Sequence, residues 1–524
     1  MNRPFYRVAP SGPVSRRDFL VVTSSLSAAA VWSSRALGVV LQNVKLPDYP
    51  FQLGVASGEP RPDGVVLWTR LAPKPLVGGG MPDAAVEVEW QVADDEQMTK
   101  IVQQGKTTAN PDWAHSVHVE VEGLRPDRWY FYRFRAAGET SPVGRTHTAP
   151  APEAVPERLR FAFASCQHFE TGYYTAYEHM LRENPDLVIH LGDYIYEGPG
   201  RDGLVRRHAG PKLVALADYR LRHAQYKTDQ ALQAMHSAAP WLVTWDDHEV
   251  ENNYADLISE KGTALEPFRE QRAQAYRAYY EHMPLRASQL PTGPDMPLFR
   301  RVSYGRLADF HVLDTRQYRT DQPCGDGGKA PCEASYDSAA TILGDKQRGW
   351  LFDGLAGSPA KWNVLAQQVM MARVDFRPGD EIAHSMDQWP GYEADRRRVL
   401  KFLHERKVTN PVVLTGDIHN NWANELPVDF DNLGGSSVAV EFVGTSISSS
   451  GDGQLESDQQ ATLLAENPFV KFHNRQRGYV VCEVTPKSWQ ANYRTVDYVT
   501  RPGSPIHTRA SFVVEDGKHT LAKA

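Results

Sequence analysis

Apolar side chains follow two different patterns along the chain, and these patterns predict two halves of different construction. Before residue 150 the apolar runs are short and alternate with polar residues, as in 64–70, 86–92 and 115–121. Alternation with a period of two at this spacing is typical of antiparallel strands in a β-sandwich. We therefore expect a β-sandwich over residues 39–148.

The segment 124–133 refines this prediction. Its sequence, Leu-Arg-Pro-Asp-Arg-Trp-Tyr-Phe-Tyr-Arg, resembles the turn and strand of fibronectin type III modules, in which a tyrosine closes a corner. The expected strand ends of this sandwich carry no cluster of carboxylates and histidines, so we expect a supporting or covering module. The proline-rich segment 149–157 predicts a stiff linker and a domain boundary.

Residues 158–524 show strand-like runs that alternate with helical patterns. Such alternation favours a mixed or parallel sheet with helices on both faces. The helices are expected at 174–183, 214–236, 267–282, 345–355 and 393–406.

Five of the expected strands in this half end in reactive side chains. Fully apolar runs are typical of buried parallel strands, and α/β sheets bind ligands at the carboxyl ends of such strands. Two of the runs end in Gly192-Asp193 and Gly416-Asp417. The other three end in Cys166-Gln167-His168, Asp246-Asp247-His248-Glu249 and Asp314-Thr315-Arg316. We expect all five ends to converge at one edge of the same sheet, with Asp193 as a metal ligand at the centre.

This set of side chains suits a site for two or more metal ions. Oxygen ligands favour iron, calcium, manganese or magnesium, whereas a thiolate or an imidazole adds a preference for a transition metal. Two cations about 3.5–4 Å apart clamp a phosphoryl group and generate hydroxide from bound water. The sequence contains no Gly-x-Ser-x-Gly segment that would supply a nucleophilic serine. The pattern therefore indicates hydrolysis of phosphate esters by a metal-activated hydroxide.

Residues 1–38 predict a targeting segment. Arg16-Arg17 stands directly before Phe19-Leu20 and an alanine-rich run, and this order resembles a twin-arginine signal peptide. The resemblance implies the twin-arginine export machinery as a partner and a periplasmic or secreted location. No later stretch is long and apolar enough to span a bilayer, so we expect no stable membrane insertion.

Charge narrows the choice of partners. The full sequence has a net charge of −7, and without residues 1–38 it keeps 52 basic against 63 acidic residues, a net charge of −11. An acidic surface argues against a protein that binds nucleic acid.

The cysteines predict one bond and one core residue. Cys324 and Cys332 bracket a turn-rich loop and are expected to form a disulfide in an oxidising compartment, although four cysteines permit three pairings. Cys482 lies in a strand-like apolar run and is expected to be a small core residue.

Taken together, the strand-end motifs resemble the PhoD family of alkaline phosphatases, a relative of the calcineurin-like metallophosphoesterases. The resemblance extends over nearly the whole chain, including the N-terminal sandwich and the twin-arginine segment. It implies a metallophosphoesterase-like α/β sandwich with mixed sheets over residues 158–524, and a site with iron(III) and calcium. The motifs are Ser165-Cys166-Gln167, residues 192–197, residues 245–250, residues 314–317 and residues 416–419.

By position, this resemblance implies Cys166, Tyr196 and His419 as iron ligands, with Asp193 as the bridge between the cations and Asp417 on calcium. Tyr194 is then expected to be a packing residue. In ordinary metallophosphoesterases a Gly-Asn-His segment supplies an amide ligand and a catalytic histidine.

The present chain departs from that pattern, because an aspartate occupies the place of the asparagine. The second-site ligands therefore stay open among Asp246, Asp247, Asn252 and Asn253. His248 is expected to be the general acid.

Arg316 is the candidate for holding the phosphate, since its planar fork matches phosphate oxygens. The alternative is a surface ion pair with Asp314 or a glutamate. The loop 384–392 resembles an aromatic active-site loop of the family, in which Trp389 and Tyr392 either bound the substrate entrance or simply pack.

We therefore expect an exported, monomeric alkaline phosphatase that acts on small-molecule phosphomonoesters and on phosphodiesters. One alternative on the same scaffold is a phosphodiesterase or phospholipase D-like hydrolase. An alternative of another class is a non-catalytic protein that binds phosphate esters.

Overall fold

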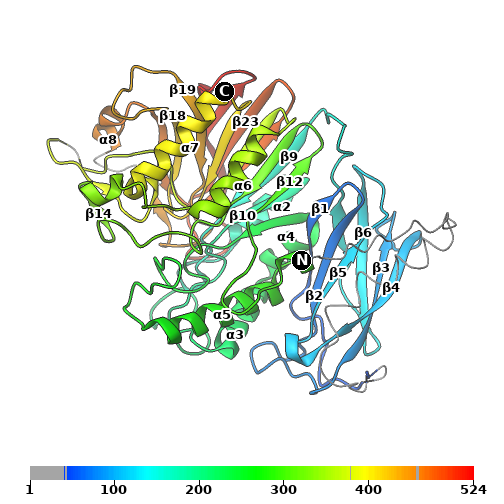
Figure 1. Cartoon of the computed structure of the whole chain (residues 1–524). Coiled ribbons are helices and arrows are strands. Elements are labelled where there is room, and N and C mark those ends of the chain that lie inside the picture. Colours follow the sequence, from blue (N-terminus) through cyan, green and yellow to red (C-terminus); the bar gives the residue numbers. More distant parts are fainter. Residues whose placement is uncertain (1–39, 42–43, 378, 456–459) are drawn as a thin grey trace, which may run out of the picture. The chain divides into compact units, whose positions relative to one another are not determined.

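The computed structural model describes residues 40–41, 44–377, 379–455 and 460–524 (Figure 1). The targeting segment expected at residues 1–38 lies outside these ranges.

Two large mixed sheets pack face to face and form the centre of residues 158–524. Among the described residues, ten strands form the first sheet in the order β25-β24-β23-β22-β9-β10-β11-β1-β2-β5. Eight strands form the second in the order β12-β13-β15-β17-β19-β18-β21-β20. Apolar residues on the facing sides, such as Phe161, Ile189, Phe310 and Leu414, are buried in one core between the sheets.

The first sheet contains β1 (Val55–Arg61), β2 (Gly64–Arg70), β5 (Ser116–Val121), β9 (Leu159–Ala164), β10 (Leu187–Leu191), β11 (Pro240–Thr244), β22 (Gly478–Val484), β23 (Ser488–Val496), β24 (Ile506–Glu515) and β25 (Ala522–Lys523). The second contains β12 (Arg300–Tyr304), β13 (Ala308–Val312), β15 (Trp362–Ala366), β17 (Pro411–Thr415), β18 (Asn421–Pro427), β19 (Ser437–Val443), β20 (Gly453–Gln454) and β21 (Val470–Gln476).

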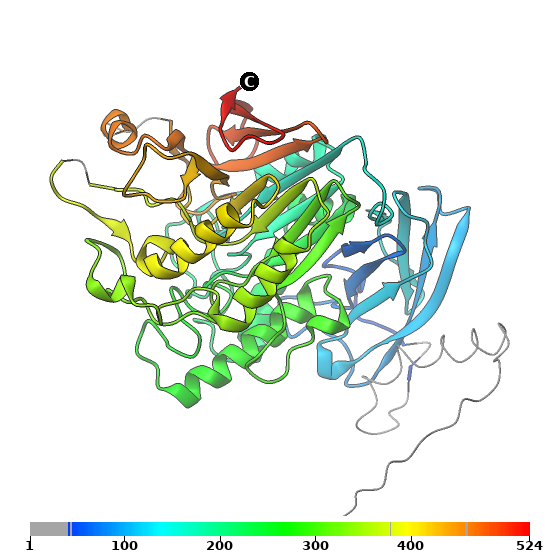
Figure 2. The ribbon, with the colours of Figure 1, turned by 45° about the horizontal axis from the view of Figure 1, so that its top comes forward.

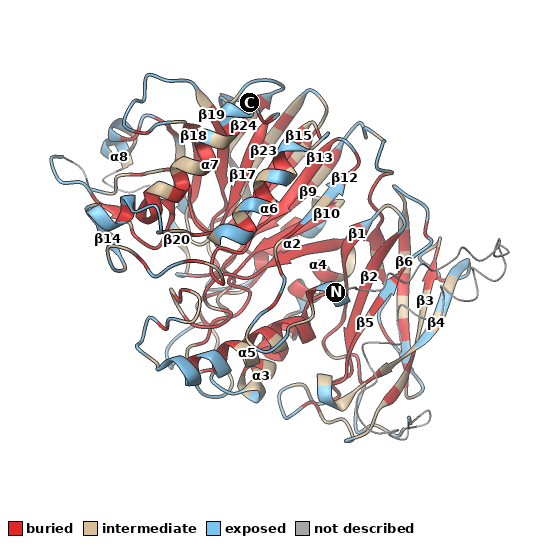
Figure 3. Cartoon of the chain, in the orientation of Figure 1, coloured by how far each residue is buried: buried red, intermediate tan, exposed pale blue. Residues whose placement is uncertain are grey.

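Helices cover the outer face of each sheet, so that residues 158–524 form an α/β/β/α sandwich (Figures 1 and 3). The first sheet packs against α2 (Thr175–Arg182), α3 (Leu216–Lys227), α4 (Gln230–Ala238) and α5 (Leu265–His282). The second packs against α6 (Gly344–Ala356) and α7 (Glu393–Glu405). The α/β sandwich with mixed sheets is thus confirmed. The expectation of one sheet with helices on both faces is wrong, because alternation of strands and helices does not tell how the strands divide between sheets.

The helix expected at 214–236 is two helices, and one side chain explains the break. Asp229 follows the end of α3, and its carboxylate accepts hydrogen bonds from the backbone N–H groups of Ala231 and Leu232. Those N–H groups have no partner within a helix that begins there, so an aspartate at this position starts a new helix.

The N-terminal strands form a β-sandwich, but one of its sheets is not separate. The strands β1, β2 and β5 face a five-stranded sheet and share an apolar core with it. The same β1 pairs in parallel with β11, with Ser57 opposite Pro240, so it extends the first sheet of the sandwich described above. The blue N-terminal and red C-terminal strands consequently lie at opposite ends of this sheet (Figure 2). The five-stranded sheet contains β3 (Val86–Ala93), β4 (Ile101–Ala109), β6 (Trp129–Ala136), β7 (Glu139–Thr140) and β8 (Gly144–His147).

A small ribbon completes the part of the fold that concerns the site. The strand β14 (Gly328–Lys329) pairs with β16 (His384–Ser385). The Cys324–Cys332 disulfide closes the loop that contains β14, which confirms the predicted bond. Cys482 is buried in β22, as expected for a core residue.

Candidate metal centre

The reactive strand ends meet where the carboxyl ends of strands from both sheets face each other. Three of them follow β9, β10 and β11 of the first sheet, and two follow β13 and β17 of the second. The prediction of a single sheet edge is therefore wrong, although the predicted convergence is present. A buried strand of either sheet has the same apolar sequence, so the sequence pattern could not assign the strands to sheets.

Strained backbone marks these strand ends. Four of the non-glycine residues there adopt the left-handed conformation, with φ of 59° at Cys166, 56° at Asp193, 62° at Asp417 and 58° at His419. Such conformations cost about 1 kcal/mol or more each and cluster at functional sites. Gly192 serves a different purpose, because a Cβ there would lie 2.5 Å from the backbone nitrogen of Asp246. Its absence lets the turn after β10 pack directly against the turn after β11.

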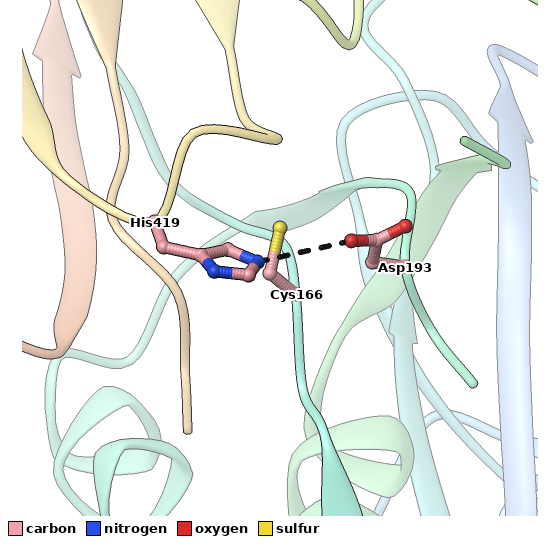
Figure 4. A group of neighbouring side chains, drawn as sticks. All are labelled: Cys166, Asp193 and His419. Atoms are coloured by element: carbon pink, nitrogen blue, oxygen red, sulfur yellow. Dashed lines mark ion pairs between the residues drawn. The ribbon is translucent and has the colours of Figure 1, made fainter. Parts of the chain in front are cut away.

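The first cluster joins a thiol, a carboxylate and an imidazole. The side chains of Cys166, Asp193 and His419 come from three different strand ends and point toward one another (Figure 4). Their ligand atoms all lie within 4.8 Å of one another. The hydroxyl of Tyr196 donates to Oδ2 of Asp193 at 2.8 Å and lies 3.2 Å from Nε2 of His419. The structure thus brings together the three expected iron ligands, Cys166, Tyr196 and His419, and the expected bridge, Asp193.

Tyr194 is directed away from this cluster. Its hydroxyl lies 2.8 Å from Nε2 of His236, beneath the helices that cover the first sheet. This placement agrees with the expected packing role.

The second cluster contains only carboxylates. Oxygen atoms of Asp246, Asp247 and Asp417 lie within 4.8 Å of one another. A third group, Asp193, Asp247 and His248, shares one member with each of the first two clusters. The two clusters are therefore continuous, and Asp193 lies where they join.

Arg316 lies inside the second cluster and not at an open phosphate site. Its guanidinium is fully buried, with Nε 2.5 Å from Oδ1 of Asp246 and Nη1 2.8 Å from Oδ1 of Asp387. The remaining nitrogen, Nη2, lies 3.6 Å from Oδ1 of Asp417 and 3.9 Å from Oδ1 of Asp247. Within the described chain Nη2 has no hydrogen-bond partner. The main contacts of this arginine are with buried aspartates, so the expected alternative of a surface ion pair with Asp314 or a glutamate is wrong, and only Nη2 is left for a phosphate oxygen.

The structure does not bring the side-chain amides of Asn252 and Asn253 into either cluster. The amide of Asn252 donates to Glu260 at 3.2 Å in an exposed position, and the amide of Asn253 donates to Asp326 at 2.6 Å. Only the backbone N–H of Asn253 reaches the site, where it donates to Oδ2 of Asp247 at 2.7 Å.

His248 and the aromatic loop complete the surroundings. Nδ1 of His248 lies 2.7 Å from Oε2 of Glu197, and its ring centre lies 4.2 Å from that of Tyr196. Trp389 and Tyr392 are fully buried and bonded to Gln367 and to the carbonyl of Thr320. Of the two interpretations of these aromatic residues, the structure supports packing.

Electrostatics shows that the first cluster is unfavourable for unpaired negative charge. Burial, together with the charge of Asp193, raises the pKa of Cys166 and the pKa of Tyr196 well above their ordinary values. Burial also raises the pKa of Asp193 itself, in opposition to His248. Burial lowers the pKa of His419 to about 3, so its imidazole is neutral, which is the form that binds metals.

In the second cluster burial also disfavours negative charge on the carboxylates, but the positive charge of Arg316 partly compensates. Burial raises the pKa of Asp417 to about 7, and Arg316 opposes this shift. Burial also acts to raise the pKa of Asp247, but Arg316, His248 and the backbone N–H of Asn253 together outweigh it, and the pKa of that carboxyl is lowered.

These residues fit cations. Oδ1 of Asp193 and Oδ2 of Asp246 are buried, and neither has a hydrogen-bond partner in the described ranges. A buried carboxylate oxygen without a partner is costly, and a positive ion relieves that cost. Thiol, phenol and imidazole suit a transition metal in the first cluster, and carboxylates suit a hard cation in the second.

Sequence reasoning missed three residues that hold the site together. The carboxylate of Glu249 accepts from the backbone N–H groups of Asp193, Asp246 and Tyr194 at 3.1, 2.8 and 2.5 Å. Glu197 holds His248, and the hydroxyl of Ser449 lies 2.7 Å from that of Tyr196. Both glutamates stand inside the quoted motifs, which was the available signal. Ser449 follows β19, a sixth buried strand that also ends in polar residues.

A fourth group, His168, Glu170 and His208, has ligand atoms equally close together. Its polar atoms are already bonded to the surrounding loop, since Glu170 accepts from the N–H groups of Arg201 and His208, and Nε2 of His208 lies 2.9 Å from the hydroxyl of Tyr226. This group stabilises the loop.

Carboxylates joined to a thiol and an imidazole, between two sheets that present their strand ends, provide what metal-assisted phosphoryl transfer requires. Fold and site therefore fit a phosphoesterase. The chain belongs to the PhoD-like phosphatase family, because residues 161–493 match the sequence model of that family. Residues 38–150 match the model of the family's N-terminal domain. It is accordingly a phosphoric ester hydrolase.

Two relatives place the chain within this family. It is 55% identical to alkaline phosphatase D of Bacillus subtilis (strain 168) over 480 residues, which are 91% of this chain and 82% of the relative. A solved structure titled "Structure of PhoD" is 54% identical and superposes with a TM-score of 0.90, covering 92% of this chain and 93% of the other. Of the helices within the described ranges, none has the length and apolar run that a bilayer crossing requires.

Proposed function

We propose that this protein is an exported alkaline phosphatase that uses iron(III) and calcium to hydrolyse small-molecule phosphomonoesters and phosphodiesters. The observation that carries the proposal is the pair of continuous clusters. One has a thiol, a carboxylate and an imidazole with the Tyr196 hydroxyl beside them, and the other has carboxylates alone. Export rests on the twin-arginine segment, which the structure does not describe. Membership of a phosphatase family argues against the non-catalytic alternative.

In the proposed site the first cluster holds iron(III). Cys166, Tyr196 and His419 would be its ligands, and Asp193 would bridge to the second cluster. The contact of 2.8 Å between the Tyr196 hydroxyl and Asp193 supports this set, because it places a phenol oxygen beside the bridging carboxylate.

The second cluster would hold calcium through Asp247 and Asp417, with Asp246 as a further carboxylate. We propose that Arg316 acts here by balancing the charge of these carboxylates and keeping them close together. Only its Nη2 is left to reach a phosphate oxygen. Asn252 and Asn253 stay weaker candidates, because their amides are bonded to Glu260 and Asp326.

Bound cations would polarise the phosphoryl group and lower the pKa of the attacking water. The chain's own residues would prepare the leaving-group side. Because Glu197 occupies Nδ1 of His248, Nε2 is the ring nitrogen left to deliver a proton to the departing alkoxide. Burial opposes a charge on His248, but Asp247 and Glu197 raise the pKa of this histidine well above its ordinary value, which favours the protonated acid form.

Elemental analysis combined with a visible absorption spectrum tests the cofactor proposal. Phenolate or thiolate bound to iron(III) absorbs visible light, so the purified protein should be coloured and should contain iron and calcium. A colourless protein that is active with zinc alone would overturn the ligand set.

Hydrolysis of mono- and bis-p-nitrophenyl phosphate, with and without added calcium, tests the substrate proposal. We expect turnover of both esters and a loss of turnover when calcium is removed. Turnover of the diester alone would instead favour the phosphodiesterase alternative.

A further inference from the structure

A buried carboxamide lies against the carboxylate cluster and has one end without a partner. Gln388 is 3% exposed and precedes the short helical turn Trp389–Tyr392. Its Nε2 donates to Oδ2 of Asp417 at 2.7 Å. Its Oε1 is buried and has no hydrogen-bond partner among the residues that the structure describes. A buried carbonyl oxygen without a partner is unfavourable, and a cation or a hydrogen-bond donor relieves that cost.

The chain holds this amide rigidly from both sides. On one side, Oδ1 of Asp387 accepts hydrogen bonds from Arg316, Arg319 and Gln322 at 2.8, 2.7 and 2.8 Å. On the other, Trp389 is fully buried and donates to Oε1 of Gln367 at 3.1 Å. A side chain held between two such anchors is preorganised for a ligand.

The surroundings indicate which ligand would satisfy this oxygen. Gln388 contacts Asp417, which belongs to the cluster with Asp246 and Asp247, and Oδ2 of Asp246 is also buried without a partner. Carboxylates together with a neutral carboxamide oxygen form the ligand set that calcium prefers. An apolar partner or another carboxylate would leave both orphaned oxygens unsatisfied.

We propose that Oε1 of Gln388 is the carboxamide ligand of the calcium site, while its Nε2 orients Asp417. This assignment gives Gln388 the role for which the sequence suggested Asn252 or Asn253. It rests on the proposed function, because it presupposes that the carboxylate cluster binds calcium. Gln388 comes from the loop after β16, whereas both asparagines come from the loop after β11.

Calcium titration of the full chain tests the proposal. Calcium is first removed with a chelator, and its affinity is then measured by calorimetry for wild type, Gln388→Met and Gln388→Glu. Methionine has a similar length and no oxygen, so Gln388→Met should weaken calcium binding about 10–100-fold. Glutamate keeps an oxygen and adds charge, so Gln388→Glu should bind calcium at least as tightly as wild type.

The pair of variants separates a ligand from a mere hydrogen-bond donor. If Gln388 served only to donate to Asp417, both variants would lose that donor and both would weaken calcium binding. Equal weakening in the two variants, or wild-type affinity in Gln388→Met, would therefore overturn the proposal. Asn252→Ala tests the competing amide and should keep wild-type affinity, and a loss like that of Gln388→Met would assign the ligand to Asn252 instead.

Two controls distinguish the possible causes of a loss of calcium binding. The visible band of the iron cluster should be unchanged in Gln388→Met, which shows that the variant is folded and has an intact first cluster. If wild type itself binds no calcium, the cofactor proposal fails as a whole, whereas a failure confined to the Gln388 variants concerns this ligand alone.

Discussion

Two buried polar regions lie on either side of the turn after β10, and they differ in what they require. The strand-end clusters contain carboxylates, a thiol and a phenol beside one arginine. A second region, which we call the histidine layer, is formed by buried residues of β10, α3, α4 and α5. It contains His190, His223, His236, His282 and Lys227, all buried.

The histidine layer also contains orphaned atoms. Both ring nitrogens of His190 and of His223 have no hydrogen-bond partner in the described part of the chain. The rings stack on each other and on aromatic residues, with 4.9 Å between the centres of His223 and His282 and 3.8 Å between those of His236 and Trp241. Burial lowers the pKa of each of these histidines, so they are neutral at pH 7.

The comparison shows that an orphaned polar atom does not by itself mark a functional site. Neutral rings in an aromatic environment tolerate burial, whereas several carboxylates in one place do not. The strand-end clusters also have left-handed backbone at Cys166, Asp193, Asp417 and His419, and no residue of the histidine layer has a positive φ in the described ranges. Like charge together with strained backbone distinguishes the site from the layer.

The sharpest test exchanges one residue in each region. Asp193→Ala removes the carboxylate where the two clusters join, so we expect loss of bound iron and calcium and a fall in activity of about 10³-fold or more. His223→Leu removes a ring with no hydrogen bonds from the histidine layer and should keep metals and activity. Elemental analysis and turnover of p-nitrophenyl phosphate measure both. Metal retained in Asp193→Ala, or lost in His223→Leu, would contradict the distinction.

Glu249→Gln tests the support of the site. The glutamine would turn an N–H donor toward backbone N–H groups of Asp193, Asp246 or Tyr194, which now donate to the carboxylate. We expect metal affinity to fall about 10–100-fold. Glu281→Gln is the matched control, because Glu281 is equally buried but is paired with Arg220, between α5 and α3. An equal loss of metal in both variants would show that removing any buried carboxylate charge weakens metal binding, and it would contradict a specific role of Glu249.

Acid should weaken the protein through the histidine layer. Because burial lowers the pKa of His190 to about 3, this histidine is neutral in the folded and unfolded chain above pH 6.5. Between pH 6.5 and about 3 the unfolded chain binds a proton that the folded chain excludes, so the free energy of unfolding falls as pH falls. Each such histidine contributes up to about 1.4 kcal/mol per pH unit.

His223→Leu tests whether a single histidine of the layer contributes to this loss of stability, since burial also lowers the pKa of His223. Urea unfolding of metal-loaded wild type and variant, from pH 8 to pH 5, should show a shallower decrease for the variant. Parallel curves would mean that His223 does not titrate on unfolding.

Loss of the disulfide should have the smallest effect. The loop closed by Cys324 and Cys332 supports the calcium side, because Asp326 accepts from Asn253 and the carbonyl of Gly327 accepts from the N–H of Met386. Replacing both cysteines with serine should lower the free energy of unfolding by about 2 kcal/mol. Calcium affinity should fall a few-fold with no change in the visible band of the iron cluster. A changed visible band with unchanged calcium affinity would show that the loop supports the iron cluster and not the calcium side.

The sequence by itself determined the strands, the residues at their ends and the chemistry that they carry. Apolar runs that stop at Asp193, Asp247 and Asp417 are local patterns, and a buried strand must bring its last residue to an edge. The role of Cys482 followed from its apolar run in the same way, whereas the choice of Tyr196 over Tyr194 came from the resemblance to the PhoD family.

Only the tertiary structure decided which strands share a sheet, which charge each carboxylate meets and which amide lies in the cluster. The sequence places Arg316 at a strand end, but its burial among Asp246, Asp387 and Asp417 arises because the second sheet packs against the first. Gln388 lies 29 residues from Asp417 in the chain, and no periodicity connects them. Contacts between elements that are distant in sequence depend on packing geometry, which local patterns of polarity do not encode.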